Sequence, residues 1–134
     1  GLDADIASLA LSPDMDKIAE QGLALPRDWR DTALDKGELF HSAIVFVVRK
    51  GNPKNITGWA DLARDDVEVI TPNPKSSGGA RWNVAAGYLY AKEAFKGDEA
   101  AIRTYVRKAF TRARVMDAGA RGSTTSFVRR RIGD

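Results

Sequence analysis

Apolar residues recur along the chain with two different periods. Four segments are continuously apolar or alternate between apolar and polar positions, which is typical of buried or half-buried strands; they are residues 4–11, 41–50, 67–71 and 113–116. Elsewhere apolar residues recur every three to four positions, as on the inward face of a helix; the predicted helices are residues 12–21, 57–63, 80–95, 98–110 and a last one that includes residues 127 and 128. Strands that alternate with helices predict an α/β fold with a layered sheet.

Capping residues mark the ends of several predicted helices. Ser12, followed by a proline, predicts a helix start with Ser12 as the N-cap, and Gly22 predicts the end of that helix. Thr57 is the expected cap of the short helix that follows it. Residues 23–41 show neither period, so we expect irregular structure there, with Trp29 as an anchor.

The helix predicted at residues 80–95 is apolar nearly all round. It carries two apolar stripes: Trp82, Ala85, Ala86 and Leu89 on one, and Val84, Tyr88, Ala91 and Phe95 on the other. A helix of this kind is usually packed on more than one side. We therefore expect Trp82 to be part of the core.

Composition excludes several classes of protein. With 134 residues and 43% apolar content the chain has the size of about one domain. A formal charge of +3 favours an anionic ligand but lacks the clustering of a nucleic-acid-binding surface, so we expect no nucleic acid. Because there is no cysteine, disulfides and thiolate metal sites are absent. No apolar run reaches the roughly 18 residues of a membrane span, so we expect no membrane insertion.

The loop Ser76–Ala80 is the strongest candidate for a binding site. It lies between the predicted strand 67–71 and the next helix, and its sequence is Ser-Ser-Gly-Gly-Ala. The first N–H groups of a helix have no intrahelical acceptor and lie at its positive end, so they favour an anion. A second strand–turn–helix junction, at residues 118–124, has the same small-residue character. Because ligands of α/β sheets bind at the carboxyl ends of strands, the two junctions are expected to converge on one anion.

The residues around these loops bear on the kind of anion. No Asp or Glu lies between Pro72 and Trp82, which suits fully ionised sulfate, whereas protonated phosphate would require an acceptor. Asp117 is the one candidate for that acceptor, although a carboxylate that accepts from the following N–H groups is the more common arrangement. Arg81 and Arg121 either neutralise the anion or pair with carboxylates to stiffen the loops, and we favour the second role.

Enzymatic and nucleotide-binding motifs are missing. The chain has neither the Gly-x-x-x-x-Gly-Lys phosphate loop nor the Gly-x-Gly-x-x-Gly dinucleotide motif. His41 is the single histidine, and no Gly-x-Ser-x-Gly turn accompanies it, so we expect no catalytic residues and no metal site. We also expect no cofactor. The run Arg129–Arg131 is typical of a solvated helix end.

Four stretches together resemble the periplasmic sulfate/thiosulfate-binding proteins of ABC transporters. They are ADIASLAL at residues 4–11, VFVVRKGNPKNITGWADL at 45–62, ITPNPKSSGGARWN at 70–83 and DAGARGSTTSFVRRRIGD at 117–134. The resemblance implies a type II periplasmic binding-protein fold, in which two α/β lobes with helices on both faces of their sheets close over the anion. It implies that Ser77, Gly78, Gly79 and Ala120 bind sulfate, with Ser76, Arg81 and Arg121 in supporting positions.

The same resemblance implies an organisation and a role. Residues 1–42 correspond to the tail of the first lobe and residues 43–134 to the second lobe, so we expect a fragment of a longer protein whose remaining ligand contacts lie outside it. The expected function is binding of sulfate or thiosulfate in the periplasm and delivery to the permease subunits, without catalysis. Molybdate or phosphate binding by the same fold, or a phosphoryl or sulfuryl hydrolase that uses the same loops, are the alternatives.

Overall fold

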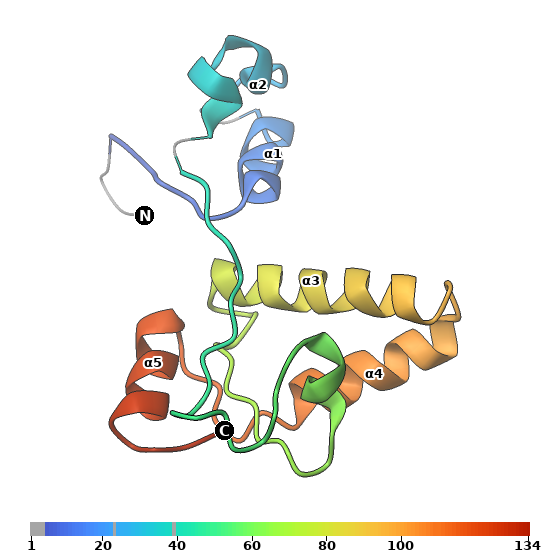
Figure 1. Cartoon of the computed structure of the whole chain (residues 1–134). Helices are drawn as coiled ribbons and strands as arrows, with labels where there is room; N and C mark the ends of the chain where they lie inside the picture. Colours follow the sequence, from blue (N-terminus) through green and yellow to red (C-terminus); the bar gives the residue numbers. More distant parts are fainter. Residues whose placement is uncertain (1–4, 23, 39) are drawn as a thin grey trace. The chain divides into compact units, whose positions relative to one another are not determined.

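The computed structural model describes residues 5–22, 24–38 and 40–134. The chain forms two compact units, Gly1–Ala43 and Ile44–Asp134, and each is considered by itself (Figure 1). The assignment of residues 1–42 and 43–134 to two lobes stays a prediction. Ala4, the first residue of the first predicted strand, lies outside the described residues.

The first unit is held together around Trp29. The described residues of this unit form two short α-helices, α1 (Ser12–Glu20) and α2 (Trp29–Thr32), and the 3₁₀ turn η1 (Leu34–Gly37). The buried Trp29 indole donates to the Asp16 carboxylate on α1 at 3.1 Å. Arg30 donates to both oxygens of the same carboxylate, at 2.5 and 2.8 Å, and lowers the pKa of Asp16. One buried aromatic ring and one shared carboxylate thus join α1 to α2.

The second unit has a small core between helices. Its elements are the 3₁₀ turn η2 (Trp59–Ala63), α3 (Gly78–Ala94), α4 (Glu99–Thr111) and α5 (Ala120–Val128). Helix α4 packs against both α3 and η2 (Figure 1). The buried cluster consists of Leu62, Ala91, Ile102, Tyr105, Ala109 and Phe110. The Tyr105 hydroxyl donates to the Trp59 carbonyl at 2.6 Å, and burial raises the pKa of Tyr105.

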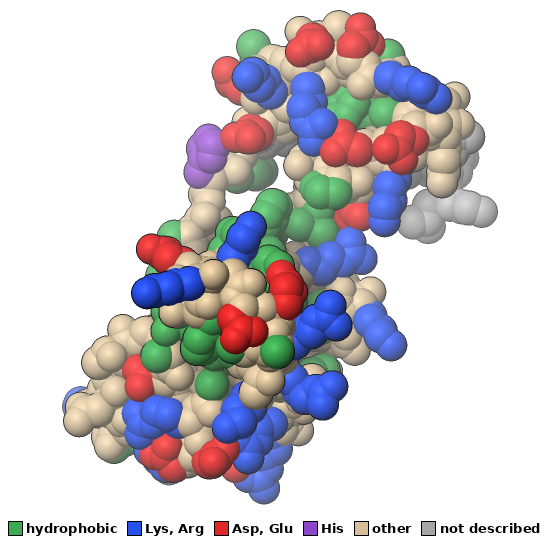
Figure 2. Space-filling view, turned by 90° about the vertical axis from the view of Figure 1, so that its right-hand side faces the viewer, with side chains coloured by type: hydrophobic (Ala, Val, Ile, Leu, Met, Phe, Trp, Pro, Cys, Tyr) green, Lys and Arg blue, Asp and Glu red, His purple; other side chains and the backbone are tan. Residues whose placement is uncertain are grey.

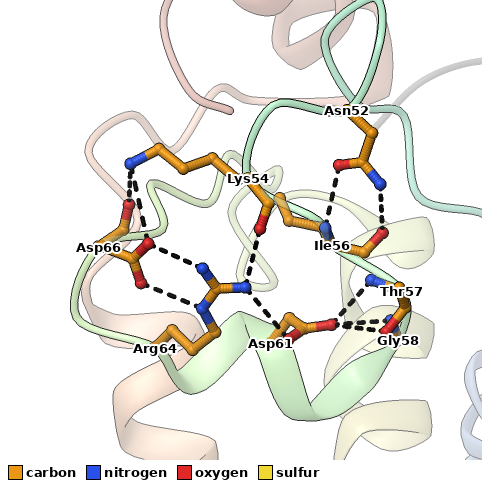
Figure 3. A network of polar contacts seen from close by, with 8 residues as sticks. All are labelled: Asn52, Lys54, Ile56, Thr57, Gly58, Asp61, Arg64 and Asp66. Atoms are coloured by element: carbon orange, nitrogen blue, oxygen red, sulfur yellow. Dashed lines mark hydrogen bonds and ion pairs between the residues drawn. The ribbon is translucent and has the colours of Figure 1, made fainter.

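A carboxylate caps η2 from within the turn. Both the N–H and the hydroxyl of Thr57 donate to Asp61, at 2.8 and 3.1 Å, and Gly58 N–H donates to the same oxygen at 3.1 Å (Figure 3). These bonds, led by the Thr57 N–H, lower the pKa of Asp61. Arg64 links Asp61 to Asp66 beyond the turn. The prediction that Thr57 itself is the cap was therefore wrong: the N-cap is Gly58, and Thr57 is a donor.

The segments predicted as strands do not form a sheet among the described residues. Residues 41–49, 67–73 and 115–117 have no regular hydrogen-bonded structure, and no strand is assigned in the parts of the chain that the structure describes. The side chains of Val45 and Val47 are 72% and 66% exposed. The prediction of strands was therefore not confirmed in the described residues, because a strand requires a neighbour that supplies a hydrogen-bonding ladder.

Three further local predictions need correction. Leu11, not Ser12, is the N-cap of α1, although the helix does end before Gly22, whose φ is 65°. Residues 23–41 contain α2 and η1 and are not simply irregular. Trp82 and Leu89 on α3 are 47% and 64% exposed, so neither belongs to the core of this unit. Helix α3 instead buries its Ala80–Gly87–Ala91 face.

Candidate anion-binding site

The first junction is a tight turn that ends in the N-cap of α3. The Asn73 carbonyl accepts from the N–H groups of Ser76 and Ser77, at 3.1 and 2.9 Å, and the Asn73 side chain accepts from Lys75 N–H at 2.9 Å. Ser77 caps α3 because its hydroxyl oxygen accepts from Ala80 N–H at 3.3 Å. The turn thereby places the Ser77 hydroxyl and the first N–H groups of α3 at one end of the helix.

The N–H groups of Gly78 and Gly79 are the free donors at this end. Both residues belong to the first turn of α3, whose N–H groups have no intrahelical acceptor. Within the described residues, no hydrogen bond from either N–H is present. Ala120 occupies the corresponding first position of α5, after the extended N-cap Gly119. These donors give each junction the chemical character of an anion site.

The structure brings the two junctions together. The Ser76 hydroxyl donates to the Ala118 carbonyl at 3.0 Å. Asn73 N–H donates to the Asp117 carbonyl at 2.8 Å. The bond from Ser76 lies directly beside Ser77 on one side and two residues before Ala120 on the other. The two loops are therefore in contact in the second unit, and their convergence on one anion stays a prediction.

Asn73 is a residue that sequence reasoning missed. It makes the bonds that shape the first turn and one of the two bonds that join the junctions. The sequence does carry a signal for this role, because Asn between two prolines is a common turn former whose side chain bonds nearby backbone. Its use as a link to a second loop is a tertiary contact and has no local signal.

Glycine is used differently in the two junctions. A β-carbon added to Gly122 would lie 2.7 Å from the Asp117 β-carbon, so this glycine is required for the close approach of α5 to Asp117. A β-carbon on Gly79 would meet only the Ser77 hydroxyl, at an ordinary 3.8 Å. Helical backbone does not require glycine there, and glycine in a helix costs up to about 1 kcal/mol relative to alanine. Neither space nor backbone conformation within this chain explains Gly79.

Both candidate arginines lie at the loops. Arg81 is exposed, and its Nε donates to the Pro74 carbonyl at 3.1 Å, a bond that braces the turn before α3. Arg121 is also exposed, and no ion pair joins it to a carboxylate of the described residues. The bond from Arg81 agrees with a stiffening role. The expected pairing with a carboxylate is not found for Arg121 among the described residues, and for Arg81 it stays a prediction.

Asp117 is turned toward α5. Its Oδ1 accepts from the buried Ser126 hydroxyl at 3.2 Å. Its Oδ2 is buried and has no hydrogen-bond partner among the described residues. The expected bonds to the N–H groups that follow Asp117 are replaced by this side-chain contact. The reason is geometric, since Gly122 lets the first turn of α5 lie directly on the Asp117 side chain.

Outside the two junctions, the described residues contain no cluster of side chains that could hold a metal ion. His41 is exposed, and its nearest acid is Glu38, 3.7 Å away. No three His, Cys, Asp or Glu side chains within the described ranges lie together in a way that would hold a metal ion. None of the helices in this part of the chain has the length and apolarity that crossing a membrane requires.

Charge is divided unequally between the two units. Residues 44–134 contain 17 Lys and Arg against nine Asp and Glu, an excess of eight positive charges, whereas residues 1–43 contain four against nine. In Figure 2 the basic side chains are spread over the surface with acidic ones between them. The unit that holds both junctions therefore carries the positive field, which raises the local concentration of anions.

The fold and the paired junctions define a bacterial solute-binding module. The chain belongs to the bacterial extracellular solute-binding protein family, whose model matches residues 1–134. It is 49% identical over 134 residues to the sulfate-binding protein of Escherichia coli K12, a match that covers all of this chain and 40% of the relative. It is 40% identical over 134 residues to the thiosulfate-binding protein of Pseudomonas aeruginosa, again over all of this chain and 40% of the relative.

A solved structure supports the same assignment. The sulfate-binding protein SubI from Mycobacterium tuberculosis H37Rv is 36% identical and superposes with a TM-score of 0.78, over 98% of this chain and 46% of that one. The α/β fold class of the type II periplasmic binding proteins, predicted from the sequence, is thus confirmed. The chain spans about 40% of the length of the curated relatives named here.

Proposed function

We propose that this chain forms part of a periplasmic protein that binds sulfate or thiosulfate and delivers it to the permease subunits of an ABC transporter. The observation that carries the proposal is the joining of two helix N-termini by the bond from Ser76 to Ala118. The names of the relatives supply the class of anion. The protein is a binder and has no catalytic role.

The proposed ligand contacts come from both junctions. The Ser77 hydroxyl and the N–H groups of Gly78, Gly79 and Ala120 donate to the anion, and the field of two helix N-termini favours its charge. Ser76, Arg81 and Arg121 support the loops. Charge-assisted hydrogen bonds are roughly twice as strong as neutral ones, so a few of them give useful affinity without a metal or a counter-cation.

The organisation proposed for the whole protein follows the two units. Residues 1–42 form the tail of one lobe, and residues 43–134 form the other lobe with the anion-binding junctions. Since the chain covers only 40% of its relatives, further contacts to the anion would come from polypeptide outside it. Sulfate is selected over phosphate because the first loop contains no carboxylate that could accept a phosphate proton.

Calorimetric titration tests the ligand directly. The 134-residue chain is titrated with sulfate, thiosulfate, phosphate and molybdate. In parallel, the matching segment of the Escherichia coli sulfate-binding protein is replaced by this chain and the chimera is titrated in the same way. Binding by the chain alone means that its two junctions suffice, and binding only by the chimera means that the remaining polypeptide is required. If neither binds sulfate or thiosulfate, the proposal is wrong.

Two substitutions at one position test the site. Asp and Asn are both good N-cap residues of nearly equal shape, so Ser77→Asp and Ser77→Asn should both keep α3 folded. Only Asp places a negative charge beside the anion, and we expect it to abolish sulfate binding, whereas Asn should weaken binding several-fold. Equal affinities of the two variants would contradict a site at Ser77.

A further inference from the structure

Helix α5 is positioned without the packing that holds the other long helices. α3 and α4 lie against each other, and α4 also packs on η2, whereas α5 has no comparable contact with another helix within the described residues (Figure 1). It is nine residues long, and an isolated helix of that length is marginal in water. Its direction must therefore be set by contacts from extended segments.

The N-terminal end of α5 is pinned by the first junction. Asp117 and Ala118 accept from Asn73 and Ser76, at 2.8 and 3.0 Å. Within α5, the Ser126 hydroxyl also donates to the Asp117 carboxylate, at 3.2 Å. All three bonds converge on residues 117 and 118, so a contact at the C-terminal end of α5 adds a second anchor that defines the direction of the axis.

Arg49 supplies that second anchor. Its guanidinium donates to the Phe127 carbonyl in the last turn of α5 at 2.8 Å. It also donates to the Ile132 carbonyl at 2.8 Å and twice to the Gly133 carbonyl, at 3.0 and 2.8 Å. The guanidinium carbon lies 3.9 Å from the centre of the Phe127 ring. One side chain thus holds both the end of α5 and the turn that follows it, across about 80 residues of sequence.

The turn held by Arg49 is tied in addition to the segment that leads into the first junction. Asp134 N–H donates to the Glu68 carbonyl at 3.1 Å, and Glu68 N–H donates to the Asp134 carboxylate at 2.8 Å. Residues 67–73 therefore contact the region of α5 at both of its ends. A planar guanidinium with five donors in a fixed geometry suits this role better than lysine, which is a flexible point charge.

We propose that Arg49 is a positioning residue for the anion site, because it sets the direction in which the first N–H groups of α5 point. This inference rests on the proposed function, in which Ala120 N–H binds the anion. N–H groups of the first turn point along the helix axis, and hydrogen bonds weaken as the donor angle departs from linearity. Arg49 touches neither Ser77 nor Ala120 and acts only through α5.

Arg64 provides a matched control. Its guanidinium also bridges backbone and carboxylates, with bonds to the Lys54 carbonyl at 2.9 Å and to Asp61 and Asp66 (Figure 3). None of these partners belongs to α5 or to the two junctions. Arg64→Gln should therefore lower stability without affecting α5. Arg49→Gln removes a comparable set of bonds from the anchor itself.

The experiment compares Arg49→Gln, Arg49→Lys and Arg64→Gln in the 134-residue chain by sulfate titration and by amide hydrogen exchange without ligand. We expect Arg49→Gln to weaken sulfate binding roughly ten-fold, the lower end of the effect seen in metal sites when a residue that orients a metal-binding side chain is lost. The amides of α5, such as that of Ser123, should exchange faster in the same variant. Arg49→Lys should give a smaller effect of the same kind, and Arg64→Gln neither effect.

Each outcome decides the inference. If Arg49→Gln and Arg64→Gln lower the melting temperature alike and leave affinity and α5 exchange unchanged, Arg49 has only a general structural role and the inference is wrong. If the wild-type chain alone does not bind sulfate, the titrations are made in the chimera; if the chimera does not bind either, the proposed function is wrong, and the exchange of the α5 amides still tests whether Arg49 positions the helix. If Arg49→Gln does not fold, the comparison is made with Arg49→Lys, which keeps the charge but not the planar set of donors.

Discussion

The Ser76 hydroxyl and the Ala118 carbonyl lie 3.0 Å apart although 42 residues separate them in sequence. Ser76 is exposed and precedes the N-cap of α3, and Ala118 precedes the N-cap of α5 by one residue. The bond therefore sets the spacing between two helix N-termini. A hydroxyl can act as such a brace without bringing charge into an anion site.

Ser76→Ala removes this brace and, with it, a longer bond of 3.4 Å from the same hydroxyl to the Asn73 carbonyl within the turn. We expect a loss of about 1 kcal/mol in unfolding free energy, the usual net value of one hydrogen bond. Sulfate affinity should fall a few-fold because the two sets of N–H donors lose their fixed spacing. Denaturant unfolding and calorimetry measure the two effects.

Ser123→Ala is the control for this substitution. The Ser123 hydroxyl is buried and has no partner among the described residues, so its removal should be neutral or stabilising. If Ser76→Ala and Ser123→Ala behave alike in both assays, the bond to Ala118 does not contribute to the site.

The two junction glycines should respond in opposite ways to alanine. Gly122→Ala brings a β-carbon within 2.7 Å of Asp117, and such overpacking typically costs about 1–3 kcal/mol of unfolding free energy. Gly79→Ala meets no such obstacle and should leave stability unchanged or slightly raised.

Binding separates the explanations for Gly79. If the anion approaches the Gly79 N–H closely, the added methyl group should weaken sulfate binding at least ten-fold in a protein that is fully folded. Full affinity in Gly79→Ala, measured by titration, would show that the glycine has no role in binding.

Local chemistry made much of the helical structure predictable. The helices near residues 80–95 and 98–110 were predicted from their apolar stripes, and the structure has helices at Gly78–Ala94 and Glu99–Thr111. The placement of Ser77, Gly78 and Gly79 at a helix N-terminus followed from the small-residue loop before the first of these helices. These features depend on neighbouring residues alone.

The rest depends on contacts between distant residues. No local pattern shows that Asn73 bonds to Asp117, or that Arg49 reaches the end of α5. Strand pairing is non-local in the same sense, so the apolar pattern did not show whether a hydrogen-bonded ladder would form between the segments predicted as strands. Trp82 was wrongly predicted to be part of the core. An apolar helix face indicates that a residue is suited to burial, but it does not show which element would cover it.

We expect Tyr105 to contribute to a loss of stability at alkaline pH. Burial raises its pKa above the ordinary value of about 10, so the folded state keeps the phenol neutral where the unfolded chain would ionise it. Its contribution is fully present below pH 10 and is lost as the pH rises from there toward the pKa of the folded state. Tyr105→Phe should lower stability at pH 7 by about 1 kcal/mol, since the Trp59 carbonyl loses its donor.

The same variant should flatten the alkaline part of the stability curve. Tyr88→Phe is the control, because the Tyr88 hydroxyl makes only an exposed bond to Glu99 at 3.3 Å. Urea unfolding between pH 7 and pH 11 measures both variants. If stability falls as steeply with rising pH in Tyr105→Phe as in the wild type, groups other than Tyr105 cause the alkaline loss of stability.

We expect Asp61 to contribute to the loss of stability at acid pH, since its pKa is lowered in the folded state whereas that of Tyr105 is raised. Hydrogen bonds from Thr57 and Gly58 lower its pKa, so its stabilising effect is present above the unfolded value of about 3.9 and is lost as the pH falls through the lower folded value. Asp61→Asn should lower stability at pH 7 and reduce the loss of stability on acidification below about pH 4.

The control is Glu93→Gln, whose exposed carboxylate makes no hydrogen bond or ion pair with the described residues, so that its removal should leave the acid branch of the curve unchanged. Urea unfolding midpoints between pH 2.5 and pH 7 test this prediction. If stability falls as steeply with acidification in Asp61→Asn as in the wild type, the cap of η2 does not contribute to the acid loss of stability.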